Sequence, residues 1–205
     1  MKKLLLITVI AAAAWLCLIG TSVKAEETVE ELKEKIINIQ NKGTLGFRNF
    51  HRCESVITYA SYVPAEDNKV MEGTELLFYY EPKNIFTNRL KGSYQVWYTQ
   101  DVIIKTMEGM ELLNSPDLLN FNYQTLSPVL DLYATNSLNI TGLPPGRYEF
   151  IAVLHDKLRK QSARKSYIFE VVPAPKPDED TAAAEPAAGL PSGHLSAIMT
   201  SITPS

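Results

Sequence analysis

The sequence contains little cysteine and little histidine. Among its 205 residues only two are cysteine and three are histidine, and His51, His155 and His194 are too far apart to form a paired metal-ligand motif. Neither a metal site nor a disulfide framework is therefore expected. Cys17 lies in the apolar N-terminal segment, which leaves Cys53 as the single cysteine of the remaining chain.

A strong excess of one charge sign is also missing. The chain has 20 basic and 23 acidic side chains, for a formal net charge of −3. This balance gives no reason to expect nucleic-acid binding. The hydrophobic content of 45% and the charged content of 21% are ordinary for a globular protein, and the length suits one domain.

The first 25 residues have the pattern of a secretory signal peptide. Lys2 and Lys3 precede an apolar run over residues 4–20, and Val23 and Ala25 supply a small-residue cleavage pattern. The alternative is an uncleaved membrane anchor, which is less favoured because the apolar run is short. Removal of three lysines and no acid changes the net charge from −3 to −6. We therefore expect a secreted or periplasmic protein with no transmembrane segment after cleavage.

Residues 26–42 are predicted to form an amphipathic helix. Thr28 and Glu31 have the spacing of a capping box. Apolar residues recur at three- and four-residue steps on one face, namely Val29, Leu32, Ile36 and Ile39. Two heptads are too short for an independent coiled coil, so this face needs a partner surface. We expect it to cover the outside of a sheet, either its own or a neighbour's in a homodimer formed through residues 29–39.

Residues 43–173 have the alternating pattern of β-strands separated by turns. About seven strands are predicted, in segments 53–63, 74–81, 92–99, 102–105, 128–140, 147–155 and 166–172. Residues 107–124 are ambiguous between a short strand and a helical turn. The absence of crossover helices excludes a parallel α/β fold and favours a β-sandwich, with a barrel as the alternative.

Several predicted strands carry apolar residues on both faces. Ile151 and Val153 oppose Phe150, and Tyr79 opposes Phe78. A sheet face exposed to water should instead be polar. Some outer sheet surface is therefore expected to be covered, and the helix over residues 26–42 is the predicted cover.

The end of the chain has the composition of a disordered tail. Residues 174–205 are rich in Pro, Ala, Gly and acidic residues and cannot bury enough apolar surface to offset the entropy of ordering. The mildly apolar segment 194–202 is the part of this tail most suited to docking on a partner.

The segment from Leu143 to Tyr148 resembles a known structural signature. Its residues Pro145, Gly146 and Tyr148 resemble the turn and tyrosine of fibronectin type III and related immunoglobulin-like domains, with one residue fewer after Leu143. The resemblance implies an immunoglobulin-like β-sandwich. It also implies that the Tyr148 hydroxyl binds the backbone upstream of the strand.

Three further segments carry a longer resemblance. Residues 52–56, 59–64 and 71–81 are similar to a group of exported bacterial proteins with one immunoglobulin-like domain and no assigned activity. The similarity covers residues 47–172. It implies a fold and export but no function.

Two residue pairs invite a catalytic interpretation that the sequence does not favour. His51 and Cys53 would share a strand face, but nothing nearby orients a base, and a small half-buried cysteine explains the pattern better. His155 and Asp156 end a strand, where an aspartate commonly starts the hairpin turn. No catalytic residue and no cofactor are predicted.

Five basic residues cluster in the connection of the last hairpin, and they are the predicted partner-binding residues. They are Lys157, Arg159, Lys160, Arg164 and Lys165. In an acidic protein this cluster would bind an anionic surface. The sequence favours a simpler interpretation, in which a charged hairpin tip keeps the protein soluble and blocks edge pairing.

Four aromatic residues offer an alternative binding mode. Tyr79, Tyr80, Trp97 and Tyr98 would form a sugar-stacking platform if exposed, but core packing is the favoured explanation of these alternating aromatics. Asn139 begins a glycosylation acceptor pattern that applies only in a eukaryote.

The sequence as a whole predicts a non-enzymatic exported module. Its expected role is binding or structural, through contacts with a protein or the cell envelope. A carbohydrate-binding accessory domain is the alternative. A hydrolase or thiol enzyme would need a cleft with converging polar groups.

Overall fold

The computed structural model describes residues 27–174 and 196–198. The described residues fall into two units that divide between Leu32 and Lys33, inside the helix. The predicted signal peptide and most of the predicted tail lie outside the described residues. The elements are α2 (Val29–Lys42), β1 (Gly46–Thr58), β2 (Ser61–Pro64), β3 (Lys69–Met71), β4 (Glu75–Lys83), β5 (Thr87–Leu90), β6 (Ser93–Thr106), β7 (Glu111–Thr125), β8 (Ala134–Asn139), β9 (Gly146–Asp156), β10 (Gln161–Val172) and β11 (Ser196–Ile198).

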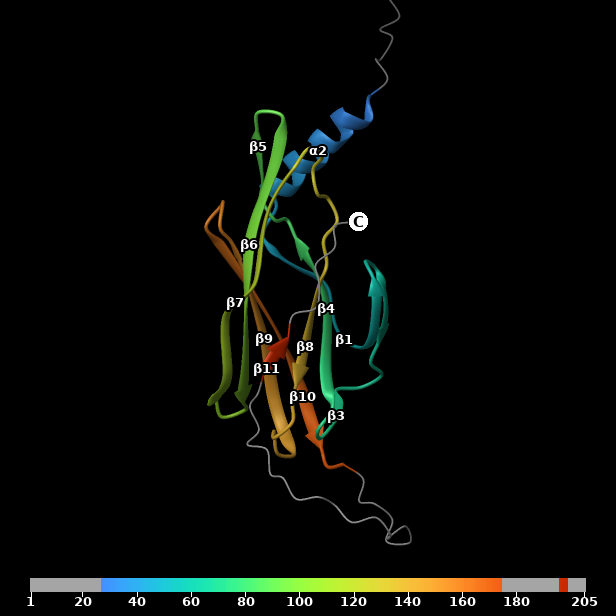
Figure 1. The fold of residues 1–205 in the computed structure, drawn as a ribbon, viewed down its shortest axis with the longest axis vertical. Helices are drawn as coiled ribbons and strands as arrows, with labels where there is room; N and C mark the ends of the chain where they lie inside the picture. Colours follow the sequence, from blue (N-terminus) through green and yellow to red (C-terminus); the bar gives the residue numbers. More distant parts are fainter. Residues whose placement is uncertain (1–26, 175–195, 199–205) are drawn as a thin grey trace, which may run out of the picture. The chain divides into compact units, whose positions relative to one another are not determined.

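The strands form two sheets (Figure 1). The first has the order β11-β8-β4-β1-β2, and the second has the order β3-β10-β9-β6-β5 with β7 also paired to β6. All pairs are antiparallel except β3 with β10. The predicted all-β fold with two sheets is confirmed.

The core lies between the inner faces of the two sheets. Phe78 of β4 stacks on Phe150 of β9 with ring centroids 4.0 Å apart and an interplanar angle of 10°. Both side chains are fully buried. The strand alternation seen in the sequence therefore does place one residue set of each strand in the core.

Three predicted strand boundaries were wrong. Segment 53–63 contains a turn at residues 59–60, between β1 and β2, and segments 92–99 and 102–105 are one strand, β6. Of segment 128–140 only Ala134–Asn139 forms a strand, β8. The pairing partner rather than the local pattern decides where each strand ends.

The ambiguous segment 107–124 forms most of a long strand, β7. It pairs along β6, and the register shifts between Gln100 and Val102, opposite the stretch that contains Pro116 and Asp117. Asp117 has a φ of 48°. A β-bulge tolerates both the missing N–H of a proline and a positive φ, which explains why the local sequence did not predict a strand.

The outer face of β4 is covered, although not by the helix. Tyr62 of β2 stacks on Tyr79 at 4.3 Å, and Tyr133 stacks on the same ring at 5.6 Å. Cys53 of β1 joins this cluster, and Tyr79 is fully buried. The rings of Tyr62 and Tyr133 thus provide the cover that was predicted for residues 26–42.

The predicted turn before β9 contains the expected backbone bond. The Tyr148 hydroxyl donates to the carbonyl of Pro144 at 2.7 Å. Gly146 has no positive φ, and an added Cβ there would meet the Tyr148 ring at ordinary contact distance. In the predicted tail, β11 pairs antiparallel with β8.

Candidate functional site

The N-terminus of α2 forms the predicted capping box. The Thr28 N–H donates to Glu31 Oε2 at 2.8 Å, and the Glu31 N–H donates to Thr28 Oγ1 at 3.3 Å. Two backbone donors that a helix start leaves unpaired are satisfied in this way. The local sequence therefore fixes where α2 begins.

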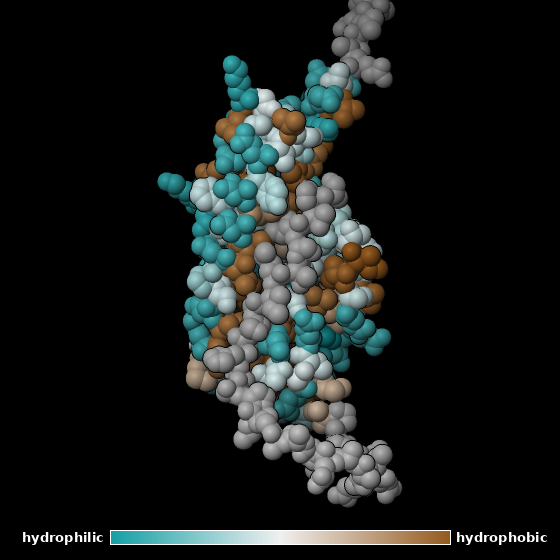
Figure 2. Space-filling view, viewed as in Figure 1, coloured by the Kyte–Doolittle hydropathy of each residue, from teal (hydrophilic) through white to brown (hydrophobic). Residues whose placement is uncertain are grey.

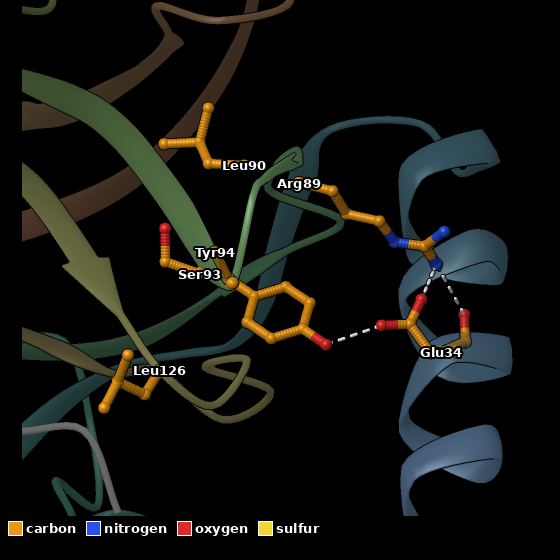
Figure 3. A pocket seen from close by; sticks show the side chains of 7 residues that line it. Glu34, Arg89, Leu90, Ser93, Tyr94 and Leu126 are labelled. Atoms are coloured by element: carbon orange, nitrogen blue, oxygen red, sulfur yellow. Dashed lines mark hydrogen bonds and ion pairs between the residues drawn. The ribbon is translucent and has the colours of Figure 1, made fainter.

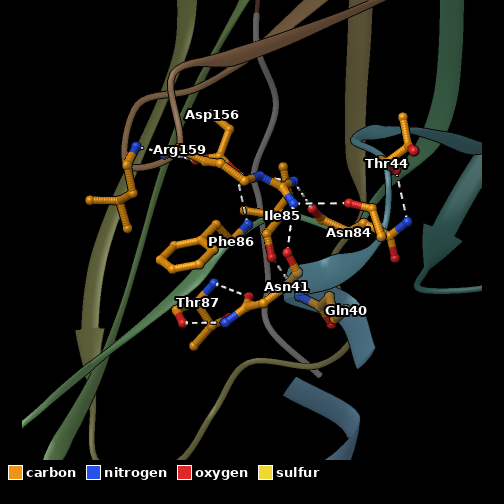
Figure 4. A network of polar contacts seen from close by, with 11 residues as sticks. Gln40, Asn41, Thr44, Asn84, Ile85, Phe86, Thr87, Asp156 and Arg159 are labelled. Carbon is orange, nitrogen blue, oxygen red and sulfur yellow. Dashed lines mark hydrogen bonds and ion pairs between the residues drawn. The ribbon is translucent and has the colours of Figure 1, made fainter. Parts of the chain in front are cut away.

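The C-terminus of α2 is bound by Arg159, a residue of the β9–β10 turn (Figure 4). Its guanidinium donates to the carbonyl oxygens of Asn41 at 3.0 Å and Gly43 at 2.9 Å, and also to that of Asn84. A helix end leaves such carbonyls without partners, and a cation is favourable there. Arg159 therefore joins the helix end and the β4–β5 connection to the last hairpin.

Asp156 holds Arg159 in place. The Asp156 side chain is fully buried and lies 3.6 Å from the Arg159 guanidinium. Its carboxylate also accepts hydrogen bonds from the backbone N–H groups of Phe86 (2.8 Å), Leu158 (3.1 Å) and Arg159 (2.9 Å). The predicted role of Asp156 as the start of the hairpin turn is confirmed.

Side-chain amides add further bonds between α2 and the sandwich. Asn41 donates to the carbonyl of Thr87 at 2.9 Å and accepts from its N–H at 2.8 Å, as a paired strand would (Figure 4). Gln40 donates to the carbonyl of Ile85 at 2.7 Å. The β4–β5 connection, β5 and the β9–β10 turn thus all form hydrogen bonds with the last turn of α2, which fixes its orientation.

Nearer the start of α2, Glu34 forms another attachment (Figure 3). It accepts a hydrogen bond from the Tyr94 hydroxyl at 2.6 Å and forms an ion pair with Arg89. These residues line a cavity of about 310 Å³ together with Leu126. Glu34 therefore points toward β5 and β6.

The apolar face of α2 is exposed and does not pack on a sheet of its own chain, so that part of the prediction was wrong. Packing on a neighbour's sheet in a homodimer stays a prediction. This α2 face consists of Val29, Leu32, Ile36 and Ile39, with exposed fractions of 61%, 45%, 45% and 72%. The buried apolar residue of the helix is Ile37. Hydrophobic side chains lie on the surface of α2 in Figure 2. The polar bonds of Glu34, Gln40 and Asn41 decide the orientation of the helix and leave the α2 face in solvent.

A groove lies beside the exposed part of α2. Its volume is about 370 Å³, and we call it the α2 groove; it is lined by Ile36, Ile39, Gln40, Arg48, Asn84, Leu130 and Asp131. Ile36, Ile39 and Leu130 make its apolar part. Exposed apolar surface next to a concave site with a few polar groups is typical of an interaction surface.

Arg48 and Asp131 are held in the wall of the α2 groove by Tyr59. Arg48 donates to the Tyr59 hydroxyl at 2.9 Å, and this hydroxyl donates to Asp131 at 3.0 Å. Arg48 also pairs with the buried carboxylate of Glu81, with its Nε 2.5 Å from Oε2. The charged groups of the groove are therefore preorganised.

Glu81 is the buried anion behind this wall. Burial disfavours its charged form, but hydrogen bonds from Asn49 (2.8 Å), Arg48 and Tyr79 (2.9 Å) outweigh burial and hold the pKa of Glu81 below its ordinary value of 4.5. A carboxyl whose pKa is lower in the folded state stabilises the protein above its unfolded pKa. This stabilisation is lost as the pH falls below about 4.5.

Replacing Glu81 with glutamine should remove this part of the acid sensitivity. We expect the Glu81→Gln variant to lose about 1–3 kcal/mol of stability at neutral pH, because its amide cannot accept all the bonds that the carboxylate accepts. Its loss of stability below pH 4.5 should be smaller than that of the natural chain. Urea unfolding across this pH range measures both effects. Glu72→Gln, at an exposed position, is the control; an identical pH profile for all three chains would contradict the prediction.

The five predicted partner-binding residues do not form one free surface. Arg159 is used inside the protein, Lys157 lies 3.3 Å from Asp117, and Arg164 lies 3.9 Å from Glu149. Lys160 and Lys165 are exposed. The role of this cluster in binding stays a prediction, and it now depends mainly on Lys160 and Lys165.

The predicted sugar-stacking residues are mostly in the interior. Tyr79, Tyr80 and Tyr98 have no exposed surface, and Trp97 donates through its indole N–H to Asn120 at 3.2 Å. A stacking platform needs exposed rings, so these four residues cannot form one.

Cys53 has the environment of a structural thiol. Burial raises its pKa to about 11, so the thiolate is scarce at neutral pH. His51 is exposed and stacks on Tyr62 rather than reaching the sulfur. The pair therefore lacks the base that a thiol nucleophile needs.

His155 binds two residues that the sequence analysis did not connect with it. Its Nε2 lies 2.8 Å from Asp101 Oδ2, and its Nδ1 lies 2.8 Å from Ser162 Oγ. The chain of contacts from Ser162 through His155 to Asp101 resembles the catalytic triad of a hydrolase. However, Ser162 stands on a regular strand, β10, directly opposite His155 on β9, so these contacts run across neighbouring strands of one sheet. The three side chains connect β6, β9 and β10.

Neither composition nor geometry points to a cofactor or a membrane span in the described part of the chain. No group of three His, Cys, Asp or Glu residues there is placed to bind a metal. Within the same residues, no helix has the length and apolar character needed to cross a membrane.

The sequence matches no protein-family model, and comparison with curated proteins finds no match.

Proposed function

We propose that this protein is an exported, non-enzymatic binding module that acts through protein contacts at the α2 face and the α2 groove. The observation that carries the proposal is the exposure of Ile36 and Ile39 on a helix whose opposite side is fixed by polar bonds. Large apolar side chains are costly in water unless a partner buries them. A helix held in one orientation also loses little conformational entropy on binding.

We further propose that the sandwich is immunoglobulin-like. The order β1-β4-β8 in one sheet and β10-β9-β6 in the other corresponds to strands A, B and E opposite G, F and C of that fold. In this assignment Tyr148 stands near the start of strand F, and its bond to Pro144 is that of a tyrosine corner. The signal-peptide pattern of the first 25 residues supports a location in the periplasm or outside the cell.

Site-specific crosslinking in the source organism tests the proposed function. A photoreactive amino acid at position 39 should give a discrete adduct with another protein, because this position is 72% exposed beside the α2 groove. The same amino acid at Met110, which is 62% exposed in another part of the chain, is the matched control. Adding Ile36→Glu should abolish the adduct at position 39 without changing the melting temperature.

The crosslinking result has two outcomes that would contradict the proposal. One is the absence of any adduct at position 39 under conditions in which the chain is exported and folded. The other is an adduct that Ile36→Glu leaves unchanged, since a partner that packs on the α2 groove must bury Ile36.

A further inference from the structure

The helix positions that border the α2 face are basic or neutral. Residues three and four apart align on a helix, so Lys33 and Gln40 border one side and Lys35 and Lys42 border the other. Glu34 is turned away toward Arg89 and Tyr94. The apolar strip of α2 therefore has a lysine on each side, Lys33 on one and Lys42 on the other.

The spacing of the α2 face specifies the shape of its partner. Val29, Leu32, Ile36 and Ile39 follow steps of three, four and three residues, which are the a and d positions of two heptads. The bordering lysines then occupy e and g positions, where coiled-coil partners place opposite charges. We infer that the occupant of this surface is a helix of another protein whose apolar strip is bordered by Asp and Glu. This inference rests on the proposed function.

A second copy of this chain fits the surface less well. Its own e and g positions hold Thr28, Lys33, Lys35, Gln40 and Lys42 and no acid. Pairing two copies would therefore bring lysines toward lysines or neutral residues, and like charges at these positions destabilise a pair.

An anionic bilayer also fits less well. The α2 groove is concave and presents the carboxylate of Asp131 and the amides of Gln40 and Asn84 beside its apolar residues. A lipid surface cannot follow a groove of about 370 Å³ or pair with these groups, whereas protein side chains can. The α2 face also has no aromatic residue of the kind that anchors interfacial helices.

Two matched peptides test the inference against the exported full-length chain. Both are about three heptads long with Leu and Ile at the a and d positions. One carries Glu at every e and g position, and the other carries Lys. In fluorescence anisotropy at low salt we expect the acidic peptide to bind about tenfold more tightly, with an advantage that shrinks as salt is added. Lys33→Glu combined with Lys42→Glu should reverse this preference.

Each result supports or overturns the inference. Equal affinity for both peptides, or a preference that survives the double charge reversal, would overturn it. Formation of a dimer in sedimentation that Ile39→Glu abolishes would assign the surface to a second copy. Binding to phosphatidylglycerol vesicles that requires Ile36 and Ile39 would assign it to lipid.

The two proposals fail in different ways. If position 39 crosslinks to a protein but the acidic peptide does not bind more tightly than the basic one, the proposed function stands. The inference that the partner is acidic is then wrong. If position 39 gives no adduct, the proposed function itself fails.

Discussion

Replacing Asp156 with alanine should lower the free energy of unfolding by about 3–5 kcal/mol, because it removes one member of a buried ion pair. The carboxylate accepts three backbone N–H groups and holds Arg159. Without it, the guanidinium that binds the carbonyls of Asn41 and Gly43 loses its counter-charge. The amide hydrogens in the last turn of α2 should therefore exchange faster with solvent. The proposed binding surface should also be held less firmly.

Chemical denaturation and amide hydrogen exchange measure these two effects. Exchange should accelerate most in residues 33–43 and in the β9–β10 turn, since these segments share the Asp156–Arg159 network. Lys165→Ala, at an exposed position of the same hairpin, is the matched control and should change stability by less than about 0.5 kcal/mol. Equal stability of the two variants would mean that the network does not hold the helix.

Replacing Gln100 with leucine should lower the free energy of unfolding by a similar amount, about 3–5 kcal/mol in all, because it leaves several buried polar groups unpaired. Gln100 lies in β6 with no exposed surface. Its amide oxygen accepts from the Tyr80 hydroxyl, and its nitrogen donates to Asn136 at 2.7 Å. Tyr80 and Asn136 belong to the other sheet, so this network connects the two layers of the sandwich.

A triple substitution separates the loss of hydrogen bonds from the cost of unpaired groups. In the chain with Tyr80→Phe, Gln100→Leu and Asn136→Leu no polar group of the network remains, so stability should recover to within about 1–2 kcal/mol of the natural chain. Urea unfolding of the single and triple variants gives the comparison. If the triple variant is less stable than Gln100→Leu, the hydrogen bonds of the network make a favourable contribution of their own. The cost of Gln100→Leu would then not come mainly from unpaired polar groups.

Both networks bear on how the protein presents its surface. The Gln100 network connects the two packed sheets, and the Asp156 network attaches the C-terminal end of α2 to the sandwich. We expect the proposed binding at Ile36 and Ile39 to depend on the Asp156 network and not directly on the Gln100 network. Variants of the two networks therefore separate loss of binding surface from loss of the fold.

Local patterns in the sequence did determine several elements. The capping box of Thr28 and Glu31 begins the helix, and the alternation around Phe78 and Phe150 produces strands with a buried face. The bond of Tyr148 to Pro144 joins residues only four apart. Each of these features depends on neighbours within about one turn or one strand, so a local motif or an alternating pattern is sufficient to predict it.

The tertiary structure alone decided which face of α2 is buried. The apolar pattern of Val29, Leu32, Ile36 and Ile39 predicted the wrong face, because Asn41 pairs with Thr87 and Arg159 binds the helix end from more than a hundred residues away. The same holds for His155, whose partner Asp101 is 54 positions away in the chain. Polar bonds between distant backbone and side-chain groups have strict geometry but no sequence period. They therefore become visible only once the sheets bring those groups together.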